Sequence, residues 1–204
     1  MDTIIQGTPE WHQLRLGKVT ASRISDCIAQ IKTGEAASRS DYRTELVTER
    51  LTGKSTEGFT NSHMMRGTEL EPEARIAYEI DKALFVAEVA FVNHPTIPMS
   101  GASPDGLVGD DGLVEIKCPA PKTHIKYLLD GRVPARYKNQ MAWQMACTGR
   151  QWVDFMSYCP ELPVNMQEFI CRYERDDDLI AELESKVIEF NNEVDQVITR
   201  LKEL

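Results

Sequence analysis

Apolar residues recur every three or four positions along the last part of the chain, between Leu179 and Leu201. This spacing gathers them on one face of a helix and leaves the charged residues on the other face. The pattern predicts a long amphipathic C-terminal helix whose apolar face packs either in the core or against another subunit.

Helix signals also mark several earlier segments. Thr8 is a candidate N-cap, followed by Pro9 at the first helical position and Glu10 in the first turn, so a short helix is expected to run to Leu16 and stop at Gly17. The other predicted helices cover residues 21–30, 41–51, 61–82, 122–129 and 134–148, and Pro72 could interrupt the longest of them.

Strand-like runs rich in β-branched and aromatic residues lie between these helices, at residues 84–93, 113–117, 152–158 and 167–173. The sequence Gly109-Asp110-Asp111-Gly112 predicts a hairpin turn. Helices and strands alternate without a repeat or a linker, which predicts one α/β domain over residues 1–204.

The charge of the chain is unevenly distributed. The chain has 23 Lys and Arg against 32 Asp and Glu, a net charge of −9. Residues 114–150, however, contain seven basic side chains and two acidic ones, whereas residues 174–204 contain four basic and ten acidic ones. This asymmetry fits an acidic exterior around a basic channel or groove, and equally fits solvated helix faces of either sign.

The five cysteines have neither metal-site nor redox spacing, which predicts reduced and mostly buried thiols. No apolar run approaches the length of a membrane span, and residues 1–17 lack the apolar centre of a secretory signal. A cytoplasmic protein without a membrane partner is expected.

Candidate chemistry lies on both sides of the predicted hairpin. Asp105 precedes it, and Glu115 and Lys117 follow it with Ile116 between them. Alternate strand residues point to the same face, so Glu115 and Lys117 share a face, and the hairpin folds Asp105 back beside them. Two carboxylates and a backbone carbonyl such as that of Ile116 suit Mg²⁺ or Mn²⁺, and Lys117 could orient or deprotonate an attacking water.

This grouping predicts metal-assisted phosphodiester hydrolysis. From the three side chains alone, the alternative is a surface salt-bridge patch. Other chemistries have less support, because the four histidines lack mutual metal spacing and Ser103 has no His-Asp pair nearby in the sequence.

The two halves of this pattern, Ser103-Pro104-Asp105-Gly106 and Glu115-Ile116-Lys117-Cys118-Pro119, resemble the PD-(D/E)XK nuclease superfamily. Within it, the chain is similar to the lambda-exonuclease, or YqaJ-type viral recombinase, family. Further motifs agree in order: Trp11 to Gly17, Thr20-Ala21-Ser22, Arg66 to Arg75, and Gln140. The resemblance covers the chain from about Trp11 to about Glu174.

The resemblance implies a restriction-endonuclease-like core, with a central mixed β-sheet flanked by helices. It also implies a Mg²⁺-dependent exonuclease, with Mn²⁺ as a substitute, that degrades one strand of duplex DNA from 5′-phosphorylated ends in the 5′-to-3′ direction. Such an enzyme leaves 3′ single-stranded tails for phage-type recombination. Its implied partners are duplex DNA ends, a single-strand annealing protein, and two further copies of itself in a ring-shaped homotrimer.

Carried over by position, the motifs assign a role to each matching residue. The catalytic residues are Asp105, Glu115, Lys117, Glu71 and Gln140. The metal ligands are Asp105, Glu115, Glu71 and the carbonyl of Ile116. The 5′-phosphate pocket consists of Arg15, Ser22, Ser103 and Gln140, and Met64 is the apolar wedge that parts the last base pairs.

Two departures from the family pattern bear on these assignments. Gln144 stands near a position where relatives carry tyrosine, and residues 33–55, from which minor-groove contacts are expected, do not align. A superfamily endonuclease or single-strand nuclease is the enzymatic alternative, and a non-catalytic DNA-end-binding module is the other. Arg15 and Ser22 favour a protein that recognises a terminal phosphate, and the intact catalytic residues favour an enzyme.

Overall fold

The computed structural model describes residues 4–56 and 62–204, with side chains from residue 65 onward in the second range. A five-stranded sheet in the order β2-β5-β6-β7-β8 carries the central part of the fold. Its strands are β2 (Val86–Ala87), β5 (Gly106–Val108), β6 (Gly112–Lys117), β7 (Trp152–Tyr158) and β8 (Glu168–Glu174). Strands β6 and β7 are parallel and the other pairs are antiparallel, which confirms the predicted mixed sheet.

A second, three-stranded sheet has the order β1-β4-β3, with β1 (Val19–Thr20), β3 (Val92–Asn93) and β4 (Ser100–Ala102). Its short strands bring the N-terminal segment beside the middle of the chain, because β1 pairs in parallel with β4. A Cβ at Gly101 would lie 2.3 Å from the Phe91 ring, so the β3–β4 pairing needs glycine there.

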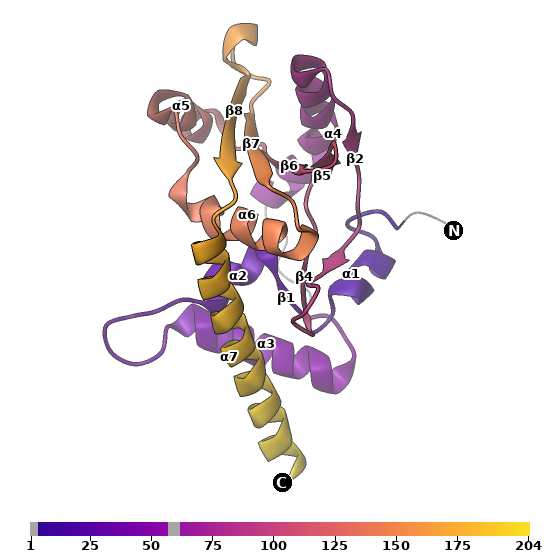
Figure 1. Ribbon diagram of the computed structural model, residues 1–204, viewed down its shortest axis with the longest axis vertical. Helices are drawn as coiled ribbons and strands as arrows, with labels where there is room; N and C mark the ends of the chain where they lie inside the picture. Colours follow the sequence, from indigo (N-terminus) through magenta and orange to yellow (C-terminus); the bar gives the residue numbers. More distant parts are fainter. Residues whose placement is uncertain (1–3, 57–61) are drawn as a thin grey trace.

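Helices flank the central sheet (Figure 1). They are α1 (Pro9–Arg15), α2 (Ile24–Cys27), α3 (Ala37–Thr52), α4 (Ser62–Lys82), α5 (Pro121–Asp130), α6 (Ala135–Thr148) and α7 (Asp177–Lys202), with short 3₁₀ turns η1 (Ala21–Arg23) and η2 (Val164–Met166). The caps agree with the sequence signals: Thr8 caps α1 through its side chain, and Gly53, Gly131 and Gly149 end their helices in the left-handed conformation.

Two helix predictions need correction. The helix expected over residues 21–30 is broken into η1 and α2 and ends at Cys27, because the chain then turns through a bridge between Gln30 and Glu35 with Gly34 at φ +86°. Pro72 does not interrupt α4, which runs through it. The remaining predicted helices are present with ends shifted by a few residues.

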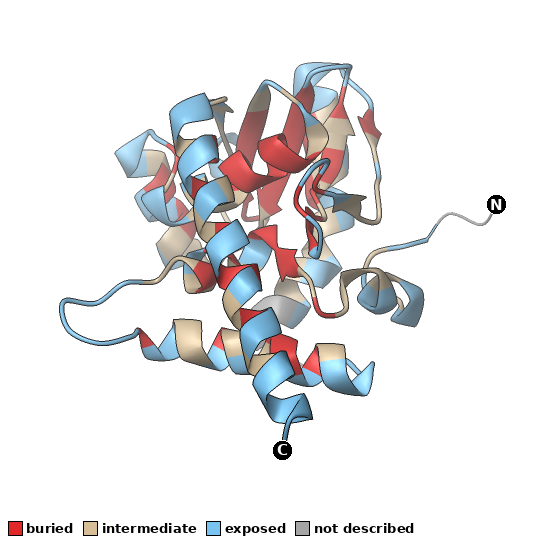
Figure 2. Ribbon diagram, turned by 60° about the horizontal axis from the view of Figure 1, so that its bottom comes forward, coloured by how far each residue is buried: buried red, intermediate tan, exposed pale blue. Residues whose placement is uncertain are grey.

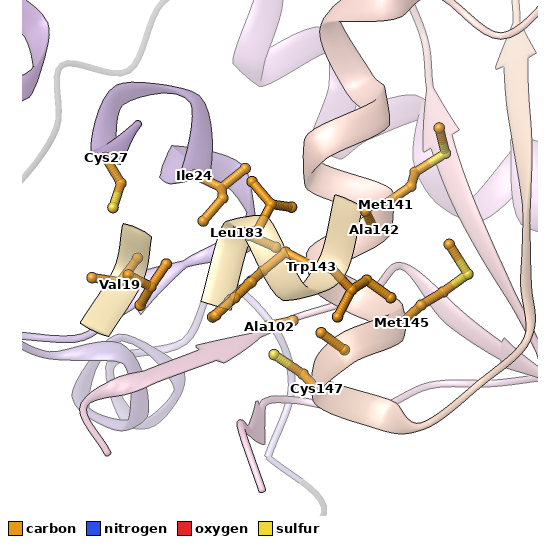
Figure 3. Close-up of a cluster of buried hydrophobic side chains, with 14 of the residues drawn as sticks. Val19, Ile24, Cys27, Ala102, Met141, Ala142, Trp143, Met145, Cys147 and Leu183 are labelled. Atoms are coloured by element: carbon orange, nitrogen blue, oxygen red, sulfur yellow. The ribbon is translucent and has the colours of Figure 1, made fainter. Parts of the chain in front are cut away.

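The core lies on both faces of the central sheet. One cluster gathers α2, α3, α6 and α7 with Leu113, Val153 and Phe155 of the sheet, and Trp143 at its centre is fully buried (Figure 3). The other packs α4 against Val114, Ile116 and Met156. The second half of α6, residues 141–147, is buried, whereas the C-terminal end of α7 is exposed (Figure 2).

The C-terminal helix therefore uses its apolar face in the core. Ile180, Leu183, Val187, Phe190 and Val194 are buried, and α7 packs against α3 and α6. Among the described residues, none of the helices combines the length and hydropathy that a membrane span needs. Four of the five cysteines are buried and all are free thiols, as predicted.

Candidate active site

The predicted hairpin is present and brings the three key side chains to one place. Leu107 pairs with Leu113 and Gly106 with Val114, so one further step of the same register sets Asp105 opposite Glu115. Asp105 Oδ2 accepts a hydrogen bond of 2.7 Å from the Ile116 backbone N–H, which fixes the carboxylate at the strand. Lys117 Nζ forms an ion pair with Glu115 Oε1.

Alternation along β6 explains this geometry. Val114 and Ile116 pack into the α4 side of the core, and Leu113 packs into the opposite cluster. Glu115 therefore points to the same face as Leu113, where its side chain is fully buried, and Lys117 follows on that face at the cavity mouth, 28% exposed. The predicted common face of Glu115 and Lys117 is confirmed.

Helix α6 completes the surroundings of Glu115. Gln140 Nε2 donates to Glu115 Oε1 and Gln144 Nε2 donates to Glu115 Oε2, each at 2.5 Å. Residues four apart share one helix face, so both amides reach the same carboxylate. In the sequence, Gln144 stands out only as a departure from the tyrosine of relatives, yet it is fully buried and holds the second oxygen of Glu115.

Replacing Gln144 with leucine is expected to lower the unfolding free energy by roughly 1.5–3 kcal/mol, because a buried carboxylate oxygen would lose its donor. Urea unfolding of the parent and the variant measures the change. In the double variant Glu115→Leu/Gln144→Leu the added cost of the second substitution should be much smaller, since the charge that needs the amide is gone. Equal costs in both backgrounds would contradict the contact.

A cavity of about 680 Å³ opens beside these residues. Asp105, Ile116 and Lys117 form one wall, Glu71 of α4 another, and Trp11 of α1 a third, while Arg136 and Tyr137 of α6 contribute the remaining side. Tyr137 lies beneath Lys117, with the ammonium 5.5 Å from its ring centroid, a cation–π contact that helps to hold the amine in place.

The electrostatics of the cavity are those of crowded carboxylates around one amine. Burial, followed by the charge of Glu115, raises the pKa of Asp105 well above its usual value, with Lys117 opposing and Glu71 adding to the rise. Burial also raises the pKa of Glu71. For Lys117 burial lowers the pKa, but the charges of Glu115 and Asp105 outweigh it and hold the pKa above its usual value.

These residues fit a hard divalent cation. Asp105 and Glu71 are partly buried carboxylates with raised pKa values, which favours a compensating positive charge nearby. The available donors are carboxylate oxygens and backbone carbonyls. In the part of the chain that the structure describes, no three His, Cys, Asp or Glu side chains form a ready metal cluster. A site built from Asp105, Glu115 and the Ile116 carbonyl, with water completing the shell, fits this donor set, and Glu71 would face it from α4.

A second group of predicted residues meets beside α1, next to this cavity. Arg15 Nη1 donates to Ser103 Oγ at 3.2 Å and Nη2 to Ser22 Oγ at 3.4 Å. Trp11 joins this group to the cavity, since its Nε1 donates to Ser103 Oγ at 3.0 Å and the Arg15 guanidinium lies 4.2 Å over its ring. One guanidinium and two hydroxyls on a common centre form a suitable anion cradle.

Gln140 and Met64 stand apart from these pairings. Gln140 hydrogen bonds to Glu115, and in the described part of the chain it has no hydrogen bond to Arg15, Ser22 or Ser103, so its role in phosphate binding stays a prediction. Met64 lies in α4, but its side chain falls outside the described residues, and the wedge also stays a prediction.

The backbone behind Arg15 is clamped from α3. Glu49 Oε2 accepts from Gly17 N–H at 2.7 Å, and Arg50 Nε donates to the Gly17 carbonyl at 2.8 Å. The same arginine reaches α7, where it contacts Asn191 Oδ1 at 2.6 Å and Asp195 Oδ1 at 2.9 Å. Gly17 has φ +69°, and a Cβ there would lie 2.8 Å from Arg50, so this clamp requires glycine.

The hairpin of the mixed sheet gathers two carboxylates and an amine, and helix α6 supplies two amides to one of the carboxylates. This arrangement defines a nuclease with the restriction-endonuclease-like fold. The YqaJ-like viral recombinase domain matches residues 10–151 of this chain. The chain therefore belongs to the YqaJ-like viral recombinase family, whose nucleases are of the lambda-exonuclease type.

Solved structures agree with this assignment. The alkaline exonuclease of Laribacter hongkongensis is 52% identical, with a TM-score of 0.90 over 96% of this chain and 97% of that one, and it is also known in complex with dAMP. A phage-related exonuclease from Haemophilus somnus 129PT, at 15% identity, shares the fold, with a TM-score of 0.70 over 90% of this chain and 96% of that one. No curated protein matches the chain.

Proposed function

We propose that this protein is a Mg²⁺-dependent exonuclease that removes nucleotides in the 5′-to-3′ direction from 5′-phosphorylated ends of linear duplex DNA. It leaves 3′ single-stranded tails for phage-type recombination, and Mn²⁺ substitutes for Mg²⁺. The observation that carries the proposal is that Trp11 lines the cavity of Asp105 and Lys117 and also donates to Ser103 Oγ, which accepts from Arg15 as well. The indole thereby links the carboxylate and amine group to the Arg15 group. A nuclease that acts at ends needs both sites within one nucleotide's reach.

In this proposal the Arg15 guanidinium and the two serine hydroxyls bind the terminal 5′-phosphate. The next phosphate then lies at the hairpin, where Asp105 and Glu115 would hold Mg²⁺ with help from the Ile116 carbonyl and Glu71. The cation supplies acidification of water and neutralises charge on the phosphoryl oxygens. Gln140 and Gln144 keep the Glu115 carboxylate in position during the reaction.

Lys117 acts on the attacking water in this scheme. In the ion pair with Glu115 its Nζ is protonated and orients the water as a donor. A cation that engaged the carboxylate charges would weaken their effect on the pKa of Lys117, so that Nζ would more readily release its proton to solvent. The neutral amine would then accept a proton from the attacking water. A mononucleotide product suits the cavity, and the Laribacter exonuclease, which is 52% identical, has been crystallised with dAMP.

The remaining parts of the proposal rest on family membership. The protein is expected to act in the cytoplasm, as a homotrimeric ring around duplex DNA, together with a single-strand annealing protein. The net charge of −9 is compatible with DNA binding if basic residues line the inner surface and acidic ones the outside.

The decisive experiment is digestion of end-labelled linear duplex with and without Mg²⁺, comparing 5′-phosphate with 5′-hydroxyl ends. The proposal expects Mg²⁺-dependent release of mononucleotides from the 5′ end and faster digestion of phosphorylated ends. Internal cuts would indicate an endonuclease, preference for single strands would indicate a single-strand nuclease, and end binding without cleavage would indicate a non-catalytic module.

Replacing Arg15 with alanine is expected to reduce the preference for phosphorylated over hydroxyl ends by roughly 10- to 150-fold, which corresponds to about 1.5–3 kcal/mol for a hydrogen-bonded charge. Initial rates on the two kinds of end measure this preference. Arg23→Ala is the matched control, because the Arg23 side chain pairs with Asp26 and Glu45 and, among the described residues, makes no hydrogen bond to the hydroxyl of Ser103 or Ser22. An unchanged preference in Arg15→Ala would remove the phosphate role.

The carboxylates also predict a pH effect. Because the pKa of Asp105 in the folded protein is above its ordinary 3.8, the group favours folding below pH 3.8, and this contribution is lost as the pH rises through the raised pKa. Thermal unfolding without metal should therefore show stability falling over that range, less so in Asp105→Asn. Mg²⁺ should restore stability increasingly as the pH rises, because it binds the deprotonated form; restoration independent of pH would contradict this.

A further inference from the structure

A second cavity, of about 540 Å³, lies between the end of α5 and the start of α6. Four cationic side chains line it, those of Lys126, Arg132, Arg136 and Lys138, against one carboxylate, that of Asp130. All four cations are exposed. We name this cavity the α5–α6 groove, and its charge is opposite in sign to that of the whole chain.

In the part of the chain that the structure describes, the cations of the α5–α6 groove have no ion-pair partners. Within the ranges 4–56 and 65–204, no salt bridge joins Lys126, Arg132 or Lys138 to a carboxylate, although Asp130 lies in the same groove. Arginines elsewhere on the molecule behave differently: Arg39 and Arg43, for example, are both paired with Glu35 and Glu193. Unpaired cations held close together in an acidic protein favour an anionic ligand with several charges.

The groove adjoins the active-site cavity. Thr123 and Arg136 line both of them. Arg136 is held at this junction by stacking, with its guanidinium 4.6 Å from the Tyr137 ring centroid, and by a hydrogen bond to the Tyr127 hydroxyl. A ligand that leaves the active-site cavity past Arg136 therefore enters a surface already lined with cations.

The position of the two proposed phosphate sites gives the direction of the strand. The terminal phosphate is expected on the α1 side, at Arg15, and the scissile phosphate at β6. Figure 1 shows α1 and α5 on opposite sides of β6, so a strand extended from Arg15 through β6 continues toward α5 and α6. Resting on the proposed function, we propose that the α5–α6 groove binds the phosphodiester backbone of the strand being degraded, on the 3′ side of the scissile bond.

This role suits the residue types present. Lysine is a flexible point charge that contacts phosphate without reading bases, so the grip is independent of sequence. After each nucleotide is removed, the next phosphate takes the place of the one before it on the same cations. The groove would thereby keep the uncut strand aligned with Lys117 between successive cuts. This would raise the processivity, that is, the run length of nucleotides removed per binding event.

The test is the triple variant Lys126→Gln/Arg132→Gln/Lys138→Gln, with Lys186→Gln/Arg200→Gln/Lys202→Gln on α7 as the control of equal charge change. Binding to a 5′-phosphorylated linear duplex is measured in EDTA at several salt concentrations. Each phosphate contact contributes roughly 0.7–0.9 to the magnitude of the slope of log K against log salt concentration. Loss of three contacts should therefore lower that magnitude by about 2 to 3 in the groove variant. The α7 control should keep the slope of the parent.

Two further measurements locate the strand. On a 5′-phosphorylated dinucleotide, too short to reach the groove, the groove variant should match the parent's kcat, whereas its run length on long duplex should fall several-fold. Neutral methylphosphonate linkages in the strand being degraded should remove the difference in binding between parent and groove variant. The proposal would be overturned if only methylphosphonate linkages in the complementary strand removed that difference. It would also be overturned if the groove variant had the same salt slope and run length as the α7 control. A parent that binds duplex with the expected slope but never hydrolyses it would overturn the proposed function alone.

Discussion

Replacing Lys117 with alanine is expected to lower the rate of DNA hydrolysis by roughly 10²- to 10⁴-fold, the usual contribution of a positioned acid or base. Its Nζ is the amine that lies against Glu115 and above the Tyr137 ring, at the cavity where the scissile phosphate is proposed to sit. Binding of duplex DNA should stay within a few-fold of the parent, because the Arg15 group and the basic surface are unchanged.

Initial rates on end-labelled duplex, together with binding in EDTA, separate these two effects. Lys122→Ala is the matched control, since Lys122 is an exposed lysine of α5 outside the active-site cavity and should digest DNA like the parent. If Lys117→Ala digested linear duplex at the parent rate, the catalytic assignment would be wrong.

The second large effect is expected from Phe155→Ala, which should lower the unfolding free energy by about 3–5 kcal/mol. Phe155 is fully buried on β7 and pairs in register with Glu115 on β6. Its ring stacks on Tyr137 at 5.2 Å and meets Tyr127 edge-on at 5.7 Å. Its loss leaves a void beneath the residues that hold Lys117, so activity should fall as well as stability.

Urea unfolding followed by circular dichroism measures this change. Phe85→Ala provides the comparison, because Phe85 is 79% exposed and its truncation should alter stability by about 0.5 kcal/mol or less. Equal destabilisation by the two substitutions would contradict the packing described for Phe155.

Local signals made much of the fold predictable. The glycine that ends α3, the Gly109 to Gly112 turn and the period of the C-terminal helix all depend on neighbouring residues, and each is present. The short strands β1 and β4 were missed, because two or three residues carry no period and their pairing joins segments about 80 residues apart. The length of the helix expected over residues 21–30 was overestimated for the same reason, because its end depends on the bridge between Gln30 and Glu35.

The site divides in a similar way. Asp105, Glu115 and Lys117 follow from strand alternation and one hairpin, so the sequence sufficed to bring them together. Gln144 and Tyr137 come from a helix that reaches the sheet only through tertiary packing. The spacing of four between Gln140 and Gln144 was a usable signal, since it gives both amides one face. Nothing in the local sequence indicated that Trp11 joins Arg15 to the cavity.

The contacts from Arg50 to Asn191 and Asp195 connect α7 to Gly17, behind the pocket proposed to bind the DNA end. Substitutions in α7 that weaken the Arg50 contacts are therefore expected to weaken its hydrogen bond to Gly17 as well. Gly17 lies two residues from Arg15, whose guanidinium is proposed to bind the terminal phosphate, so such substitutions should also change the preference for phosphorylated ends. In homologues with another side chain at position 191 or 195, the preference for phosphorylated ends is expected to differ as well.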